Sequence, residues 1–345
     1  MSTTPHAGSS RAPKSIGLWG APSSGKTTFL ASLFIAVGRR PQKDMAIFGV
    51  DDASTNFLID STRTMTRDYK FPAATQAAVS YSWTLNMDTL VERTEAGRFG
   101  RKTTTAEVRR SQFNIDLRDA PGGYFGNQPA QSPQLQRINL GGGGSPAAGA
   151  APAVSAEAEM MDYLSGCDGL LLLIDPVREQ ELGDAHDYFQ TTLLKIAQRK
   201  LAAPGAEHRL PHHVAVCVTK FDHPDVYRFA KVNKYHVYEE EDPYLFPRVH
   251  ENDAEGFFRE FCRTSRKGEA ELICSALGSY FEPDRVRFFV SSAIGLHLGD
   301  STRFRDNGSP QNTEDVNGVP SIRGRVYPIN VLEPILWLGQ RVMAE

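Results

Sequence analysis

Residues 20–27 read GAPSSGKT, and this stretch decides the fold. The apolar run SIGLW (15–19) comes directly before it, and Thr28 and the run FLASLFIAV (29–37) follow. Glycines at the two ends of such a loop let backbone N–H groups turn inward around an anion, and the N-terminus of the next helix adds positive charge. The stretch therefore predicts an anion-binding loop between a buried strand and an amphipathic helix.

Four residues give this loop its chemistry. Gly20 and Gly25 supply the tight turn, Lys26 has the length to reach the terminal phosphates of a nucleotide, and Thr27 offers a hydroxyl to Mg2+. A glycine-rich turn without a ligand is the alternative interpretation of the same letters. The strand pattern before the loop and the helix pattern after it favour nucleotide binding.

Composition sets the broad class. The chain has 345 residues, of which 40% are hydrophobic and 23% charged, with a formal net charge of -3. This balance is typical of a globular protein and gives no indication of nucleic-acid binding. The first fourteen residues lack an apolar segment, and no run approaches the ~20 apolar residues of a membrane span. We therefore expect a cytoplasmic protein whose four cysteines are reduced core thiols.

Apolar runs and helical patterns alternate along the chain, which predicts an α/β fold with a mainly parallel sheet and helices on both faces. Residues 1–14 are expected to form a disordered tail and residues 15–345 one domain. The expected buried strands are 15–19, 169–174, 214–218 and 286–290. The expected helices are 26–37, 157–164, 178–199, 254–277 and 330–343, with a turn or two of helix at 56–65.

Four further segments interrupt that alternation. Residues 78–87 and 108–117 alternate in polarity and predict an antiparallel hairpin, joined by a charged connection. Residues 127–156 are rich in Gly, Pro and Ala, which predicts a flexible insertion. Residues 223–255 are expected to form an irregular insertion, and residues 299–325 a polar loop.

Three short motifs follow predicted strands at the edge where ligands bind in such sheets. Asp119-Ala120-Pro121-Gly122 offers an acid that can orient a Mg2+-bound water and a glycine N–H that can meet a γ-phosphate. In Thr219-Lys220-Phe221-Asp222, the carboxylate of Asp222 can accept the ring N–H and the exocyclic amine of guanine, whereas adenine presents the wrong donor pattern. The backbone amide of Ser292-Ala293 can meet the guanine O6.

The order GxxxxGKT, DxxG, TKxD, SA resembles the translation-factor and Ras-like class of P-loop GTPases over nearly the whole chain. The resemblance implies a three-layer P-loop NTPase fold of the Ras-like type, with GTP/GDP and Mg2+ as cofactors. The size and the insertions are similar to those of bacterial relatives of Ras, among which the double-GTPase families are one candidate. The nucleotide contacts that the resemblance implies are Ser23, Ser24, Gly25, Lys26, Thr27, Thr28, Thr219, Lys220, Asp222, Ser292 and Ala293.

The resemblance also implies a set of catalytic and metal-binding positions. Lys26 and Gly122 would contact the γ-phosphate, and Thr27 and Asp119 would hold Mg2+, the acid through water. The family needs a threonine in its first mobile loop, and Thr75 stands just before the first hairpin strand, where such a threonine belongs. Other threonines compete for this role, namely Thr55, Thr62, Thr64 and Thr66.

One position departs from the family pattern. Ras-like proteins carry a glutamine after the DxxG glycine, and here that residue is Gly123, which has no side chain to orient water. Phosphoryl transfer depends on positioned polar groups, so intrinsic hydrolysis is expected to be slow. Ser23 stands where some self-activating GTPases bind potassium or sodium, but we interpret it as a plain loop serine. His208, His212 and His213 are interpreted as solvated histidines rather than metal ligands.

These observations predict a GTP-binding regulatory protein with slow, Mg2+-dependent hydrolysis of GTP to GDP and phosphate. Its partners would be the nucleotide and an unidentified effector or activating protein, without a membrane span. The first alternative is a GTP-dependent scaffold that scarcely hydrolyses GTP, which Gly123 favours. The second is a P-loop ATPase or kinase, for which the TKFD motif would have no use.

Overall fold

The computed structural model describes residues 14–40, 44–73, 79–96, 102–119, 153–202, 205, 207–265, 269–306 and 310–344. The expected switch threonine Thr75, together with Gly122 and Gly123, lies outside these residues. So do the tail 1–13 and most of the expected flexible insertion, although its last four residues belong to helix α3 (Ala153–Gly166). The helix therefore begins earlier than predicted, because Ala153 and Ala156 are strong helix formers despite their low-complexity surroundings.

Four parallel strands form the central sheet. They are β1 (Ile16–Gly20), β5 (Gly169–Ile174), β6 (His213–Val218) and β9 (Val286–Val290), arranged in the order β1-β5-β6-β9. These are the four apolar runs of the sequence, and β1, β5 and β6 are buried along their whole length. A continuous apolar run suits a strand that is covered on both faces, so the predicted parallel core is confirmed.

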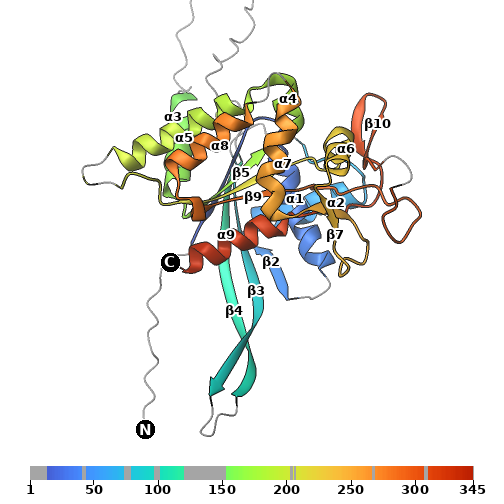
Figure 1. The fold of residues 1–345 in the computed structure, drawn as a ribbon, viewed down its shortest axis with the longest axis horizontal. Helices are drawn as coiled ribbons and strands as arrows, with labels where there is room; N and C mark the ends of the chain where they lie inside the picture. The colour runs from blue at the N-terminus through green and yellow to red at the C-terminus, as the bar shows by residue number, and fades with distance from the viewer. Residues whose placement is uncertain are drawn as a thin grey trace, which may run out of the picture.

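Alternate residues of β5 enter two different hydrophobic cores. Leu170 and Leu172 pack in a core with residues of α3, α5 (Ala185–Leu201), α7 (Glu251–Arg263) and α8 (Ala270–Tyr280). Leu171 and Leu173 pack in the other, with residues of α1 (Lys26–Arg39) and α9 (Leu332–Ala344). Figure 1 shows α9 crossing one face of the sheet. The fold is mixed α/β and compatible with a P-loop NTPase.

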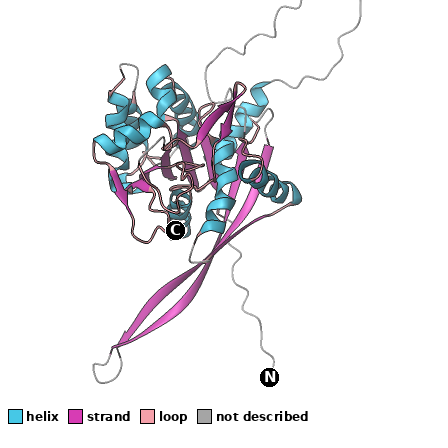
Figure 2. Cartoon of the chain, turned by 90° about the vertical axis from the view of Figure 1, so that its right-hand side faces the viewer, coloured by secondary structure: helices cyan, strands magenta, loops and turns pink. Residues whose placement is uncertain are grey.

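A second sheet extends from this body. Strand β2 (Met45–Gly49) pairs with β3 (Val79–Ala96), which pairs antiparallel with β4 (Lys102–Asp119). The predicted hairpin is present but longer, because the charged connection also pairs, from Ala96↔Lys102 onward. Its outer part, residues 88–96 and 102–110, we call the arm, and Figures 1 and 2 show the arm projecting beyond the rest of the described chain. Threonines favour extended backbone, which explains strand structure in a polar run.

Several expected elements are shorter or more ordered than predicted. The expected helix 178–199 is two helices, α4 (Pro176–Leu182) and α5, because Gly183 takes a left-handed φ of 69° that ends α4. The expected helix 254–277 is likewise split into α7 and α8. Helix α2 (Asp52–Thr66) has 15 residues rather than a turn or two, and the side chain of Asp51 caps its N-terminus.

Both expected irregular segments contain regular structure. Residues 223–255 hold α6 (Pro224–Val232), β7 (His236–Tyr238), β8 (Pro247–Val249) and the first turn of α7. The side chains of His223 and His250 cap α6 and α7 by accepting hydrogen bonds from the backbone amides of Asp225 and Asn252. The sequence pattern did not predict this capping role. The polar loop 299–325 holds the hairpin of β10 (Thr313–Val316) and β11 (Val319–Ile322).

The histidine prediction is wrong for two of three residues. His208 is exposed, but His212 and His213 are 1% and 5% exposed, because β6 begins at His213 inside the sheet. Burial lowers the pKa of His212 to about 4, and its Nε2 lies 3.2 Å from the carbonyl oxygen of Ser165. All four cysteines are buried free thiols, as expected. No helix of the described residues has the length and apolar character needed to cross a bilayer.

Candidate functional site

The loop between β1 and α1 has the backbone geometry that its glycines allow. Gly25 caps α1 with a left-handed φ of 88°, and Ser23 has a φ of 61°. A Cβ on Gly20 would lie 2.6 Å from the carbonyl oxygen of Leu173 and 2.7 Å from the Oγ of Ser24. The first glycine is therefore required by close packing on β5, and the second by its backbone conformation.

Lys26 folds back over this loop. Its side chain is buried, and its Nζ donates to the carbonyl oxygens of Gly20 at 2.9 Å and Ala21 at 3.0 Å. These bonds hold the ammonium at the start of the loop, while the residue itself is the first of α1. A fixed positive charge beside a helix N-terminus is the arrangement that attracts phosphate groups.

Ser24 lies beneath the loop rather than facing the cavity. It is fully buried, and its amide donates to the carbonyl oxygen of Ala21 at 3.3 Å. Its Oγ has no hydrogen-bond partner among the described residues. Its carbonyl oxygen accepts a hydrogen bond from Thr219 Oγ1 at 3.1 Å. Of the expected phosphate contacts in the loop, Ser24 is the one that has no place in the lining of the cavity.

Asp222 lies just after β6 and is 8% exposed. Its Oδ1 accepts a hydrogen bond from Ser292 Oγ at 2.5 Å, and that oxygen accepts one from the amide of Gly295 at 2.8 Å. Burial raises the pKa of the Asp222 carboxyl above its ordinary value, against the opposing effect of the bond from Ser292. Ser292 thus orients the carboxylate from behind, and Ala293 faces the cavity.

Two further residues of the TKFD motif, Thr219 and Lys220, make contacts with neighbouring segments. Thr219 Oγ1 lies 3.1 Å from the carbonyl oxygen of Ile174, the last residue of β5, and equally close to that of Ser24. Lys220 has a left-handed φ of 59°, and its Nζ lies 2.5 Å from Oδ2 of Asp175. The ends of β5 and β6 and the loop after β1 are therefore joined by side-chain contacts.

These elements surround one pocket of about 810 Å³. Lys26 and Asp222, which are 196 residues apart in sequence, both line it. The sequence-predicted residues in its wall are Ser23, Gly25, Lys26, Thr27, Thr28, Thr219, Lys220, Asp222 and Ala293. The structure thus brings the anion loop and the candidate base-binding residues to one cavity large enough for a nucleotide.

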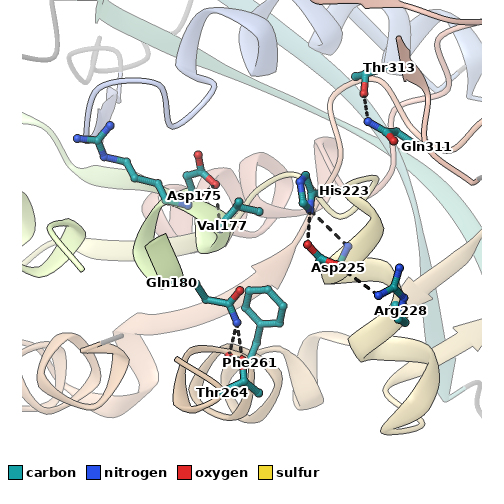
Figure 3. Close-up of polar contacts among 11 residues, drawn as sticks. Asp175, Val177, Gln180, His223, Asp225, Arg228, Phe261, Thr264, Gln311 and Thr313 are labelled. Atoms are coloured by element: carbon teal, nitrogen blue, oxygen red, sulfur yellow. Dashed lines mark hydrogen bonds and ion pairs between the residues drawn. The ribbon is translucent and has the colours of Figure 1, made fainter. Parts of the chain in front are cut away.

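The wall of the pocket also includes residues that the sequence reasoning missed, among them Phe71, Pro72, His223, Ile294, Thr313 and Pro320. Figure 3 shows His223 beside Asp225 at the start of α6, and Thr313 beside Gln311. The β10–β11 hairpin joins this wall because the amide of Ile322 donates to Tyr69 O at 2.8 Å. Of these residues, only Phe71 could have been suspected from the sequence, because it is an aromatic residue four positions before the expected switch threonine.

The expected Mg2+ site is described in part. Thr27 lines the pocket, and Asp119 is the last residue of β4, where its backbone pairs with Val79. The side chain of Asp119 is not among those described, and Thr75 lies outside the described residues. Within the described part of the chain, no three His, Cys, Asp or Glu side chains gather as a metal site. A threonine hydroxyl with one carboxylate and phosphate oxygens nevertheless suits Mg2+.

The four threonines that compete with Thr75 share one element. Thr55, Thr62, Thr64 and Thr66 all lie on α2, and none of them lines the pocket. The Oγ1 of Thr66 donates to the carbonyl oxygen of Thr62 at 2.6 Å within that helix. Because these threonines lie on a helix outside the lining of the pocket, Thr75 stays the prediction.

Comparison with known proteins places the chain in no family. No protein-family model matches the sequence, and no curated protein matches it. Among solved structures, the chain is similar to one of sup35 complexed with GDP, at 13% sequence identity and a TM-score of 0.29. The alignment covers 84% of this chain but only 40% of that chain. Similarity at this TM-score is too low to support an argument about either fold or function.

Proposed function

We propose that this protein is a GTP-binding regulatory switch of the Ras-like P-loop class, which slowly hydrolyses GTP to GDP and phosphate with Mg2+. One observation carries the proposal: Lys26 and Asp222 line the same pocket. The first is a cation for phosphates and the second an acceptor for guanine N–H groups. We further expect a cytoplasmic protein that acts on an effector protein.

The chemistry of each residue follows from its place in the pocket. Lys26, Thr27 and the N–H groups at the start of α1 would hold the phosphates, since they form the positive end of a helix. The carboxylate of Asp222, held by Ser292, would accept two N–H groups of guanine, while Ala293 N–H would meet O6. Mg2+, held by Thr27 with Asp119 and Thr75, would neutralise phosphate charge.

Specificity for guanine rests on the same carboxylate. Adenine offers only an acceptor nitrogen where guanine offers a ring N–H, so a buried Asp222 facing adenine would lose its partner. A polar group buried without a partner costs about 1–3 kcal/mol, which is enough to discriminate between the bases. The P-loop alone would not separate a GTPase from an ATPase or kinase.

Gly123 favours a second candidate, a GTP-dependent scaffold that binds the nucleotide and scarcely hydrolyses it. A glycine has no side chain to orient the attacking water, and catalysis of phosphoryl transfer is almost entirely positioning and charge stabilisation. The two candidates share the pocket and the nucleotide, and they differ only in turnover.

Nucleotide competition tests the proposal directly. Purified full-length protein is titrated with GDP and ADP in the presence of Mg2+, together with Lys26→Ala and Asp222→Ala variants. We expect GDP to bind much more tightly than ADP, Lys26→Ala to weaken both, and Asp222→Ala to weaken GDP alone. Tighter binding of ADP than of GDP would overturn the proposed function.

Turnover separates the switch from the scaffold. Phosphate release from GTP is followed over hours for the wild type and for Lys26→Ala. Slow release that Lys26→Ala abolishes supports the GTPase. Equal release from both proteins would remove the enzymatic activity from the proposal and leave the scaffold.

A further inference from the structure

Asp175 is a buried carboxylate that the sequence analysis did not single out. It directly follows β5, the strand between β1 and β6, and its side chain is 3% exposed. Its Oδ1 accepts hydrogen bonds from the amides of Val177 at 3.0 Å and Arg178 at 3.2 Å, which caps α4. Figure 3 shows Asp175 at the start of that helix. Its second oxygen, Oδ2, is 2.5 Å from Lys220 Nζ.

The pairing of Asp175 with Lys220 is selective. A second cation, Arg178, is near, but its guanidinium makes two hydrogen bonds to Asp184, at 2.6 Å and 2.9 Å. The ammonium of Lys220 is thus the side-chain cation bound to Asp175 among the described ion pairs. Because the Asp175 carboxylate is buried, removing the ammonium would leave its charge uncompensated, so the contact constrains where Lys220 lies.

Lys220 is a residue that needs such a constraint. It lines the pocket, its side chain is 41% exposed, and its backbone adopts a left-handed φ of 59° that favours glycine or asparagine. A lysine has a flexible four-carbon stem, and ordering that stem on ligand binding costs rotamer entropy. An ion pair formed before the ligand arrives removes most of that cost at the time of binding.

We propose that Asp175 is a positioning residue of the base subsite: it holds the Lys220 ammonium so that the lysine stem forms a fixed wall beside guanine. This inference rests on the proposed function. The role is distinct from capping α4, because the cap uses Oδ1 and the lysine contact uses Oδ2. Substitutions that preserve the cap and remove the charge can therefore separate the two roles.

Asp175→Asn is the variant that makes this separation. Asparagine caps helices as well as aspartate, so α4 keeps its N-cap while Lys220 loses its anionic partner. We expect GDP to bind about tenfold more weakly, a change of about 1.4 kcal/mol. Inorganic tripolyphosphate, which occupies the loop alone, is expected to bind as it does to the wild type. The matched control is Asp51→Asn, the same change at the cap of α2, and it should leave GDP binding unchanged.

A double substitution shows whether Asp175 acts through Lys220. Lys220→Met keeps an apolar stem of similar length and removes the ammonium. If Asp175 acts only by holding Lys220, adding Asp175→Asn to Lys220→Met weakens GDP binding no further. Wild-type affinity of Asp175→Asn for GDP, or full additivity of the two effects, would overturn the inference while leaving the GTP-binding function intact. A wild-type protein that does not prefer GDP to ADP would instead remove the proposed function itself.

Discussion

The hydroxyl of Thr219 donates to the carbonyl oxygen of Ser24 at 3.1 Å, a contact between residues 195 positions apart. The same hydroxyl lies 3.1 Å from the carbonyl oxygen of Ile174 at the end of β5. One buried side chain therefore joins loop 20–25 to the ends of β5 and β6, which Asp175 and the TKFD motif follow. This contact ties the loop that leads to Lys26 to the segment that leads to Asp222.

Thr219→Val tests the importance of that contact. Valine keeps the shape of the side chain but has no hydroxyl, so the buried carbonyl oxygen of Ser24 loses its hydrogen-bond donor. Such a loss lowers the free energy of unfolding by about 1–3 kcal/mol. We expect weaker GDP binding and a lower melting temperature. Thr192→Val is the control, because Thr192 is also fully buried and its Oγ1 bonds Tyr188 O inside α5, away from the pocket. Equal GDP affinity in the two variants would contradict the prediction.

Gly20→Ala is expected to damage the loop through packing alone. The new Cβ would lie 2.6 Å from the backbone oxygen of Leu173, and overpacking of this kind typically costs about 1–3 kcal/mol. Gly38→Ala in α1 is the matched control, since its Cβ would have nothing within 4 Å and alanine favours helix. Thermal unfolding should show Gly20→Ala destabilised and Gly38→Ala equal to the wild type or more stable. A stable Gly20→Ala protein would show that the loop can shift.

The candidate site could be predicted from sequence where motifs report local chemistry. The residue types in the loop from Gly20 to Thr27 and in the TKFD tetrapeptide indicate which polar atoms each motif can offer to a ligand. The structure brings both motifs to one pocket. Thr313 and Pro320 could not be found this way, because a hairpin inside a polar loop reaches the pocket only through tertiary pairing with residues 69–70. Asp175 was missed for a similar reason, since its proposed role depends on Lys220, which follows the neighbouring strand β6.

Asp222→Asn is expected to exchange the base preference. Asparagine keeps one oxygen that can accept the ring N–H, but its amide nitrogen is a donor where the carboxylate accepted the exocyclic amine of guanine. A donor there suits the C2 carbonyl of xanthine. GDP affinity should fall at least about tenfold, and xanthosine diphosphate should become the better ligand. Competition between the two diphosphates measures the exchange. A variant that still prefers GDP would argue against Asp222 as the base-reading residue.

GDP binding should also depend on the ionisation of Asp222. Burial raises the pKa of this carboxyl above its ordinary value of 3.8, and only the ionised form accepts both guanine N–H groups. Protonation therefore competes with GDP, and affinity falls as the pH drops through the raised pKa, earlier than for an exposed aspartate. Titration of GDP binding from pH 7 downward in the wild type and in Asp222→Asn isolates this step, because the ligand is the same and only the carboxyl is removed. The same pH profile in both proteins would exclude Asp222 as its source.

His212 should make stability depend on pH in a defined range. Its pKa is about 4 in the folded chain against an ordinary 6.5, because burial disfavours the charged ring. Between these values the unfolded chain binds more protons, so the free energy of unfolding falls as the pH is lowered, by about 3 kcal/mol at most. His212→Gln should flatten this slope, whereas His208→Gln, at an exposed position, should not. Identical slopes in all three proteins would contradict the assignment.

The fold could be predicted from the sequence where the hydrophobic periodicity is strong. The prediction failed where a single residue changes the direction of the chain. The four buried strands carry uninterrupted apolar runs, and each is found where expected. The break between α4 and α5 depends on one left-handed glycine, Gly183, within an otherwise helical pattern. The sequence analysis underestimated the length of β3 and β4 because their outer residues are polar. In this outer part, backbone pairing between the two strands, rather than burial in a core, keeps the chain extended.

The β3–β4 ribbon keeps one register over its whole length, from Ala96↔Lys102 to Val79↔Asp119. No bulge interrupts it, and a slip by one residue would turn every side chain to the opposite face. The outermost described pair of the arm, Ala96↔Lys102, and Asp119 are thus the two ends of one continuously paired ribbon. A partner that bound the arm would therefore contact the same strand, β4, that ends at the residue expected beside Mg2+.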